Sequence, residues 1–183
     1  VNISSPNTAN LRNFHDEKKF EELINTIEEE KIKLKSKTPI VVKISPDILD
    51  NQINLISEIL LKYKVSAIIV SNSTETSREN LQNILKHQKG GLSGKPLEQK
   101  SNKLIAKFYN LLKGKIKIIG VGGVDSGKSA YEKFLAGADY IQLYTGMVFQ
   151  GPNIVGNIKK ELKELLINEG VNNFKEIIGK KDN

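Results

Sequence analysis

Apolar, β-branched runs alternate along this chain with segments of helical periodicity, and this alternation limits the possible folds more than any other feature. The runs are almost continuously apolar, as expected for parallel strands that are covered on both faces. The segments between them repeat apolar residues about every 3.6 positions, as amphipathic helices do. The pattern predicts an α/β fold with a parallel sheet, whose strands lie near residues 38–45, 65–72, 115–123 and 138–146.

The rest of the chain fits the same plan. A further helix is expected after Pro152, followed by a short amphipathic segment at 172–180. The connection between Asn72 and Pro96 is long, polar and rich in glycine, which is typical of a working loop or lid. The chain begins at Val1, within a transition that resembles the end of a strand. We therefore expect the N-terminus to be a cut and residues 1–183 to form a single-domain fragment.

Composition limits the chemistry that the chain can support. It has no cysteine and only two histidines, His15 and His87, so a thiolate or imidazole metal site is not expected. We expect both histidines to lie in surface loops. The net charge is +7, but lysine and glutamate alternate on the predicted helix faces. With only Arg12 and Arg78 as arginines, a nucleic-acid partner is not expected. No run approaches the ~20 apolar residues of a membrane-spanning helix.

The residues that end each apolar run share a polar character. In parallel α/β folds, ligands bind beyond the carboxyl ends of the strands, so these residues are expected to meet in one pocket. Such a pocket offers amides, hydroxyls and one lysine, which suits a planar, polar heterocycle. Glycines after one strand and Tyr-Thr-Gly after the next suit a phosphate. The residues are Asn2, Ser4, Ser5 and Asn7; Lys43; Ser71, Asn72 and Ser73; Gly120, Gly122 and Gly123; and Tyr144, Thr145 and Gly146.

Six segments of the chain, in this order and spacing, resemble class 2 dihydroorotate dehydrogenases. They are VNISSPNT, VVKISPD, IIVSNST, GGLSGKPL, IIGVGGV and IQLYTG. The resemblance covers essentially the whole chain and implies the C-terminal half of a (β/α)₈ TIM barrel that holds FMN. Because a complete barrel has about 250 residues, the N-terminal portion of the barrel is expected to be absent. The implied activity is oxidation of dihydroorotate to orotate in pyrimidine biosynthesis, with a quinone as final electron acceptor.

The resemblance also implies residue roles. Ser5 would be the base that takes a proton from C5 of dihydroorotate, and Thr8 a candidate for the proton route. Lys43 would place positive charge beside the flavin. The implied FMN contacts are Asn2, Lys43, Ser71, Gly94, Gly123, Tyr144 and Thr145. The implied substrate contacts are Asn2, Asn7, Asn72 and Ser73.

The resemblance distinguishes subclasses as well. Class 1 enzymes carry a cysteine base where this chain has Ser5, and this chain has no cysteine. Ser71 and Ser73 depart from the threonines common in the family, which keeps the hydroxyl and removes a methyl group. Class 2 relatives are associated with the bacterial or mitochondrial inner membrane, through N-terminal helices that this sequence does not contain. Quinone use, membrane association and localisation are therefore expected by analogy.

A competing interpretation comes from Gly122–Ser129, GGVDSGKS, which matches the phosphate-binding P-loop pattern and follows a predicted strand. Under this alternative the chain binds a nucleotide. The next strand, however, ends without the acidic residue that would hold Mg²⁺, and the motif leaves VNISSPNT and Lys43 unexplained. Substitution of Lys128 distinguishes the two interpretations. A third alternative is an inactive barrel fragment, because an incomplete barrel has open sheet edges.

Overall fold

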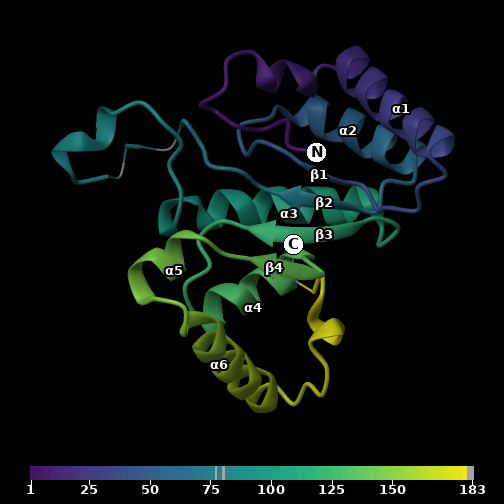
Figure 1. The fold of residues 1–183 in the computed structure, drawn as a ribbon. Coiled ribbons are helices and arrows are strands. Elements are labelled where there is room, and N and C mark those ends of the chain that lie inside the picture. The colour runs from purple at the N-terminus through teal and green to yellow at the C-terminus, as the bar shows by residue number, and fades with distance from the viewer. Residues whose placement is uncertain (77, 80, 181–183) are drawn as a thin grey trace.

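Four parallel strands, paired in chain order, form the centre of the fold (Figure 1). The computed structural model describes residues 1–76, 78–79 and 81–180. Each strand hydrogen-bonds to the next one along the chain, with Val42 opposite Ile68 and Ile68 opposite Ile118. The strands are β1 (Val41–Lys43), β2 (Ala67–Val70), β3 (Lys117–Val121) and β4 (Tyr140–Gln142). The predicted alternation of parallel strands and helices is confirmed.

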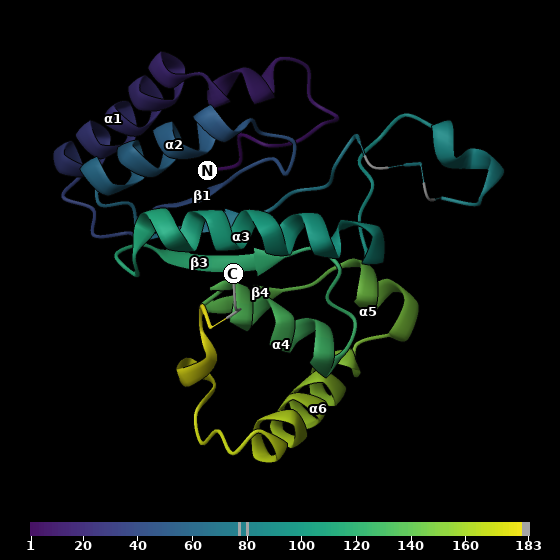
Figure 2. The same cartoon turned by 180° about the vertical axis from the view of Figure 1, so that it is seen from behind.

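Helices connect the strands and pack on one another in chain order, α1 on α2, α2 on α3, α3 on α4 and α4 on α6. Seen from behind, α3 runs alongside β3 (Figure 2). The α-helices are α1 (Glu17–Lys33), α2 (Asp50–Lys62), α3 (Glu98–Leu112), α4 (Gly127–Ala136), α5 (Thr145–Gln150) and α6 (Ile154–Asn168). The 3₁₀ helices of the described residues are η1 (Leu11–His15), η2 (Ile84–His87), η3 (Lys95–Leu97) and η4 (Phe174–Ile177). None of the described helices is both long enough and apolar enough to cross a membrane.

The apolar residues that predicted the strands form the main core. Ile44 and Ile68 of the sheet region, and Ile105 and Phe108 of α3, are fully buried. Their burial drives the helices onto the sheet, because removing apolar surface from water is the dominant favourable term in folding. A smaller cluster joins α4 to α6 through Ala130 and Ile158. The C-terminal segment closes against this layer, where the rings of Phe134 and Phe174 lie 5.0 Å apart.

Several element boundaries differ from the predictions. The strands span only three to five residues, because the apolar runs extend beyond the hydrogen-bonded ladder at both ends. The predicted strand end at the N-terminus contributes one isolated parallel bridge, between Asn2 and Lys43. Within the predicted loop between Asn72 and Pro96, the part around η2 projects from the body of the molecule (Figure 1), and η3 begins at the end of the loop.

The predicted surface position of His15 is wrong. Its side chain is buried, because its ring is enclosed between η1 and the loop after β1. Nδ1 lies 2.9 Å from the carbonyl oxygen of Arg12, and Nε2 lies 3.3 Å from the amide nitrogen of Ser45. The Ser45 amide is a donor, so Nε2 accepts and Nδ1 carries the proton. Burial lowers the pKa of His15 below its ordinary value, which favours this neutral ring. His87 is exposed, as predicted.

Candidate functional site

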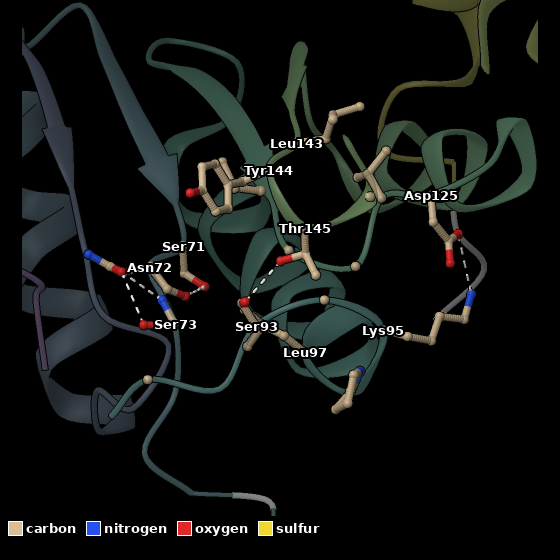
Figure 3. Close-up of a pocket in the computed structure, with 18 of the residues that line it drawn as sticks. Ser71, Asn72, Ser73, Ser93, Lys95, Leu97, Asp125, Leu143, Tyr144 and Thr145 are labelled. Carbon is tan, nitrogen blue, oxygen red and sulfur yellow. Dashed lines mark hydrogen bonds and ion pairs between the residues drawn. The ribbon is translucent and has the colours of Figure 1, made fainter. Parts of the chain in front are cut away.

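A cavity of about 630 Å³ lies beyond the carboxyl ends of the strands (Figure 3). Its position is the one expected for ligands of parallel α/β folds. The segments that line it follow β2, β3 and β4, together with η3 and the last residue of β1. The lining residues are Lys43, Ser71, Asn72, Ser73, Gly91, Ser93, Gly94, Lys95, Pro96, Leu97, Val121, Gly122, Gly123, Val124, Asp125, Leu143, Tyr144, Thr145, Gly146, Phe149 and Gln150.

Most of the predicted flavin contacts line this cavity. Lys43, Ser71, Gly94, Gly123, Tyr144 and Thr145 all do so, as do the predicted substrate contacts Asn72 and Ser73. Four predicted residues are outside the lining: Asn2, Ser5, Asn7 and Thr8. Strand ends that are far apart in sequence therefore meet at one edge of the sheet, as the strand-end argument required.

The part of the cavity wall after β2 is built from polar side chains. Oδ1 of Asn72 accepts hydrogen bonds from the backbone amide of Ser73, at 2.8 Å, and from its hydroxyl, at 3.3 Å. Nδ2 of Asn72 donates to Oγ of Ser4, at 3.0 Å, and that hydroxyl donates to Oδ1 of Asn2, at 2.6 Å. This chain of hydrogen bonds connects the N-terminal segment to the cavity wall and holds the Asn72 amide in one orientation.

The N-terminal loop that carries Ser5 lies beside this wall. Oγ of Ser5 accepts a hydrogen bond from the amide of Asn7, at 3.2 Å, and the loop is partly exposed. Gly91 packs against both the N-terminal loop and the cavity wall. A Cβ at this position would overlap Oγ of Ser73 in the wall and lie 3.0 Å from Cγ of Pro6 in the loop. The loop is thus in contact with the segment that returns from the long connection.

The opposite part of the cavity is built from backbone. Gly122 and Gly123 follow β3 with φ angles of +114° and +77°, which glycine adopts readily. A Cβ at Gly122 would lie 2.9 Å from Cδ2 of Leu97, and one at Gly123 would overlap Glu98. The backbone at these two glycines can therefore approach η3 and α3 closely, and both glycines line the cavity. Gly94 makes a similar approach to Thr145, whose hydroxyl lies 2.9 Å from that of Ser93.

Charged groups at the cavity were only partly predicted. Lys43, at the end of β1, is the predicted lysine, but Lys95 also lines the cavity. Nζ of Lys95 lies 2.6 Å from Glu98 and 3.8 Å from Asp125, and the hydrogen bond to Glu98 raises the pKa of Lys95. The prediction missed Lys95, Ser93 and Asp125. Signals were present in the sequence: Ser93 and Lys95 belong to the GGLSGKPL segment, and Asp125 follows Gly123 by two residues within the Gly122–Ser129 motif.

Asp47 anchors the base of the long connection. Its carboxylate accepts hydrogen bonds from the hydroxyl of Thr74 and the amide of Glu75, and it pairs with Lys100 of α3 and with Arg12. Burial alone would raise the pKa of Asp47, but the hydrogen bonds from Lys100 and Thr74 outweigh this effect and lower it. The carboxylate therefore stays ionised and joins four separate segments below the cavity.

The P-loop alternative finds no support in the geometry of its motif. The amide of Gly127, at the start of α4, donates to a carboxylate oxygen of Glu161, at 2.5 Å. A Cβ at Gly127 would overlap Glu161, so α6 covers the place where a P-loop presents its amides to phosphate. Lys128 is exposed and does not line the cavity.

Comparison with known proteins agrees with this geometry. The family model described as "Dihydroorotate dehydrogenase" matches residues 1–166. The chain is similar to the mitochondrial dihydroorotate dehydrogenase (quinone) of Mus musculus, with 40% identity over 181 residues, which cover 98% of this chain and 46% of that protein. It is also similar to the dihydroorotate dehydrogenase (quinone) of Buchnera aphidicola subsp. Schizaphis graminum, with 43% identity that covers 88% of this chain and 49% of that protein.

Solved structures confirm the predicted barrel architecture. The crystal structure of dihydroorotate dehydrogenase from Eimeria tenella in complex with ferulenol superposes with a TM-score of 0.93 and 32% identity. The superposition covers 98% of this chain and 52% of that chain. The chain thus spans about half the length of the relatives that it matches, and its four strands correspond to part of a TIM barrel. With a family match over 166 of its residues, the chain belongs to the dihydroorotate dehydrogenase family.

Proposed function

We propose that this chain forms the C-terminal part of an FMN-binding barrel, residues 1–183 being one domain fragment, in a protein that oxidises dihydroorotate to orotate. The observation that carries the proposal is the cavity at the carboxyl ends of the strands, with a backbone-built part and an amide-rich part. Its volume of about 630 Å³ falls within the 300–1,000 Å³ typical of cofactor sites. Family membership supports the same function.

The residues present fit FMN. The glycines at 122 and 123 leave peptide groups bare beside the cavity, and a Cβ on Gly123 would be blocked by Glu98. Such bare backbone, together with the hydroxyl of Thr145, suits a phosphate. Ser71 and Tyr144 would contact the flavin ring, which would lie between the two parts of the cavity. Gly94, which packs against Thr145, and Asn2, which is hydrogen-bonded to Ser4, would supply the remaining contacts. When bound, FMN supplies the ring that accepts a hydride from C6 of dihydroorotate.

Lys43 is placed to supply charge. It ends β1, lines the cavity and is half-buried. A fixed positive charge in a partly desolvated site stabilises negative charge that develops during a reaction, since it needs no reorganisation at that moment. Lys43 would therefore favour electron-rich states of the ring bound beside it.

The amide-rich part would bind the pyrimidine. Asn72 and Ser73 line the cavity, and their hydrogen bonds to each other and to Ser4 hold them ready to meet a planar ring. Asn7 and Asn2 would complete the contacts from the N-terminal loop. Ser5, on the same loop, would take the proton from C5, and Thr8 would pass it toward solvent. Since serine is a weak base in water, this role requires the loop to bring Oγ against the substrate.

Quinone as final electron acceptor and association with a membrane belong to the same proposal. Their support is the similarity to quinone-dependent relatives, one of them mitochondrial and others bacterial. Both properties would reside in parts of the protein outside the described residues. The isolated 183 residues would lack turnover, because β4 and the N-terminal segment leave two sheet edges open.

The decisive experiment is the visible absorbance spectrum of the protein expressed from its complete reading frame, before and after anaerobic addition of dihydroorotate. A flavin band that bleaches is the expected result. Bound flavin that does not bleach would refute the substrate while retaining the barrel. Failure of FMN to copurify or to reconstitute would refute the cofactor as well. The isolated 183 residues, tested in parallel, should show no bleaching.

A further inference from the structure

Lys133 is a fully buried lysine that lies outside the cavity and has no role in the proposed reaction. It belongs to α4 and has no exposed side-chain surface. Its Nζ donates hydrogen bonds to Oδ1 of Asn102, at 2.8 Å, and to Oγ of Ser101, at 3.2 Å. No salt bridge to Lys133 is present among the described residues. Burial of an ammonium group is costly unless hydrogen bonds compensate for the lost water, so these two α3 residues are essential partners.

Strand β3 has a glycine, Gly120, where the side chain of Lys133 packs against it. A Cβ at Gly120 of β3 would lie 3.2 Å from Cδ of Lys133 and 3.0 Å from Cβ of Ala138. The methylene groups of Lys133 therefore run directly beneath the backbone of β3. From there the ammonium group reaches α3, so that a single side chain joins α4, β3 and α3.

Ser101 extends this connection to the cavity. Its hydroxyl donates to the carbonyl oxygen of Val121, at 2.6 Å, and the same carbonyl accepts the amide of Ser71, at 3.2 Å. Val121 and Ser71 both line the cavity. Because the Ser101 hydroxyl donates its proton to the carbonyl oxygen of Val121, its Oγ can accept the hydrogen bond from Nζ of Lys133. The lysine thus fixes the direction of the Ser101 hydrogen bond.

The same part of α3 supports the glycine backbone. Leu97, Glu98 and Ser101 are the residues that a Cβ on Gly122 or Gly123 would meet. The position of the first turns of α3 consequently sets the position of the peptide groups that would receive a phosphate. Lys133 holds those turns through its hydrogen bonds to Ser101 and Asn102.

The charge on Lys133 is sensitive to pH near neutrality. Burial lowers its pKa to about 7, against a smaller opposite effect from Glu98 of α3. The other charged groups close to its partner Asn102 line a polar groove of about 660 Å³ on the outer surface; they are Lys95, Lys103, Lys128 and Glu132. An anion bound at the glycine backbone would favour the charged form of Lys133, and by linkage the charged form would favour the anion.

We propose that Lys133 is a positioning residue for the phosphate end of the FMN site, acting through Ser101 and the carbonyl of Val121 on the Gly122–Gly123 backbone. The proposal rests on the proposed function, because it presumes that FMN occupies the cavity. It predicts that Lys133 affects flavins that carry a phosphate and not flavins that lack one. A lysine that served only to fill space would affect both kinds of flavin equally.

The test compares FMN with riboflavin, which lacks the phosphate, in the full-length protein after removal of flavin. Dissociation constants come from fluorescence titration. Lys133→Met should weaken FMN binding about tenfold, the size of one lost hydrogen bond in a preorganised site, and leave riboflavin binding within about twofold. Lys128→Met, on the same helix but exposed, is the matched control and should bind both flavins like the wild type. Because Lys133 loses its proton as pH rises through about 7, the difference in FMN affinity between the wild type and Lys133→Met should become smaller above that pH.

Ser101→Ala provides an independent variant should Lys133→Met fail to fold. It removes the link to Val121 and should reproduce the selective loss of FMN affinity, and the double variant should lose no more than either single one. Wild-type FMN affinity in Ser101→Ala, or equal losses of FMN and riboflavin, would overturn the proposal. A wild-type protein that binds neither flavin would instead refute the proposed function itself, so the two failures are distinct.

Discussion

The two ends of the cavity are made in different ways. The glycine end, Gly122 and Gly123, presents bare backbone held against α3. The amide end, Asn72 and Ser73, presents side chains held by hydrogen bonds that reach the N-terminal segment at Ser4. The glycine end requires residues without a Cβ, whereas the amide end requires side chains with hydrogen-bonding partners.

This difference determines how each end should respond to substitution. An added methyl group should damage the glycine end, where there is no room for it, whereas loss of a hydroxyl or amide should damage the amide end. The ends should also affect different measurements. The glycine end should control cofactor affinity, and the amide end with its adjoining loop should control substrate reaction.

The largest effect is expected on the loop beside the amide end. Ser5→Ala should slow flavin reduction by dihydroorotate about 10²–10⁴-fold, the usual contribution of a general base, with unchanged FMN affinity. Stopped-flow measurement of flavin bleaching tests this. Ser66→Ala, at an exposed position before β2, is the control and should reduce flavin at the wild-type rate. Rapid bleaching in Ser5→Ala would remove Ser5 from the role of base.

At the glycine end, Gly123→Ala should weaken FMN binding about 10²-fold, because the added Cβ would overlap Glu98 and displace the backbone beside the cavity, an overpacking cost of about 1–3 kcal/mol. Gly114→Ala is a matched control, since Gly114 has a similar φ of +72° but no atom within 4 Å of the added Cβ. It should lose stability and keep FMN affinity. Comparable FMN binding by both variants would show that the glycine end is not used for the cofactor.

A smaller effect concerns the pH dependence of stability. Burial lowers the pKa of His15 below 6.5, so between these two values the unfolded chain binds a proton that the folded protein does not. The free energy of unfolding should therefore be highest above pH 6.5 and fall as pH decreases toward the folded-state pKa. Urea unfolding at several pH values measures this. His15→Gln should flatten the slope and His87→Gln, at an exposed site, should retain it; an unchanged slope in His15→Gln would assign it to other groups.

The smallest effect is expected at Lys128. Under the P-loop alternative this lysine would be essential for nucleotide binding, but it lies exposed on α4 and away from both ends of the cavity. Lys128→Ala should change neither the FMN affinity nor the rate of flavin reduction by more than about twofold, as for most exposed substitutions. Wild-type binding of ATP, measured by calorimetry and lost in Lys128→Ala, would revive the alternative.

Several features of this protein were determined by the sequence alone. The alternation of apolar runs and helical periodicity was sufficient for the parallel sheet, because periodicity reports which faces of an element are buried. The residues at the ends of the runs were sufficient to name the part of the cavity that follows the strands, since the carboxyl ends of parallel strands meet at one edge. Lys43, Ser71, Asn72, Gly123 and Tyr144 were found in this way.

Only the tertiary structure decided which polar side chains are buried. His15 is enclosed because Ser45, 30 residues away, donates to it, and Lys133 because Asn102, 31 residues away, accepts from it. Neither partner is visible in a local pattern. Lys95 and Asp125, which are 30 residues apart, likewise form an ion pair at 3.8 Å in the lining of the cavity. Periodicity is a property of neighbouring residues, whereas the cost of burying a polar group is offset by partners that only the completed fold brings within hydrogen-bonding distance.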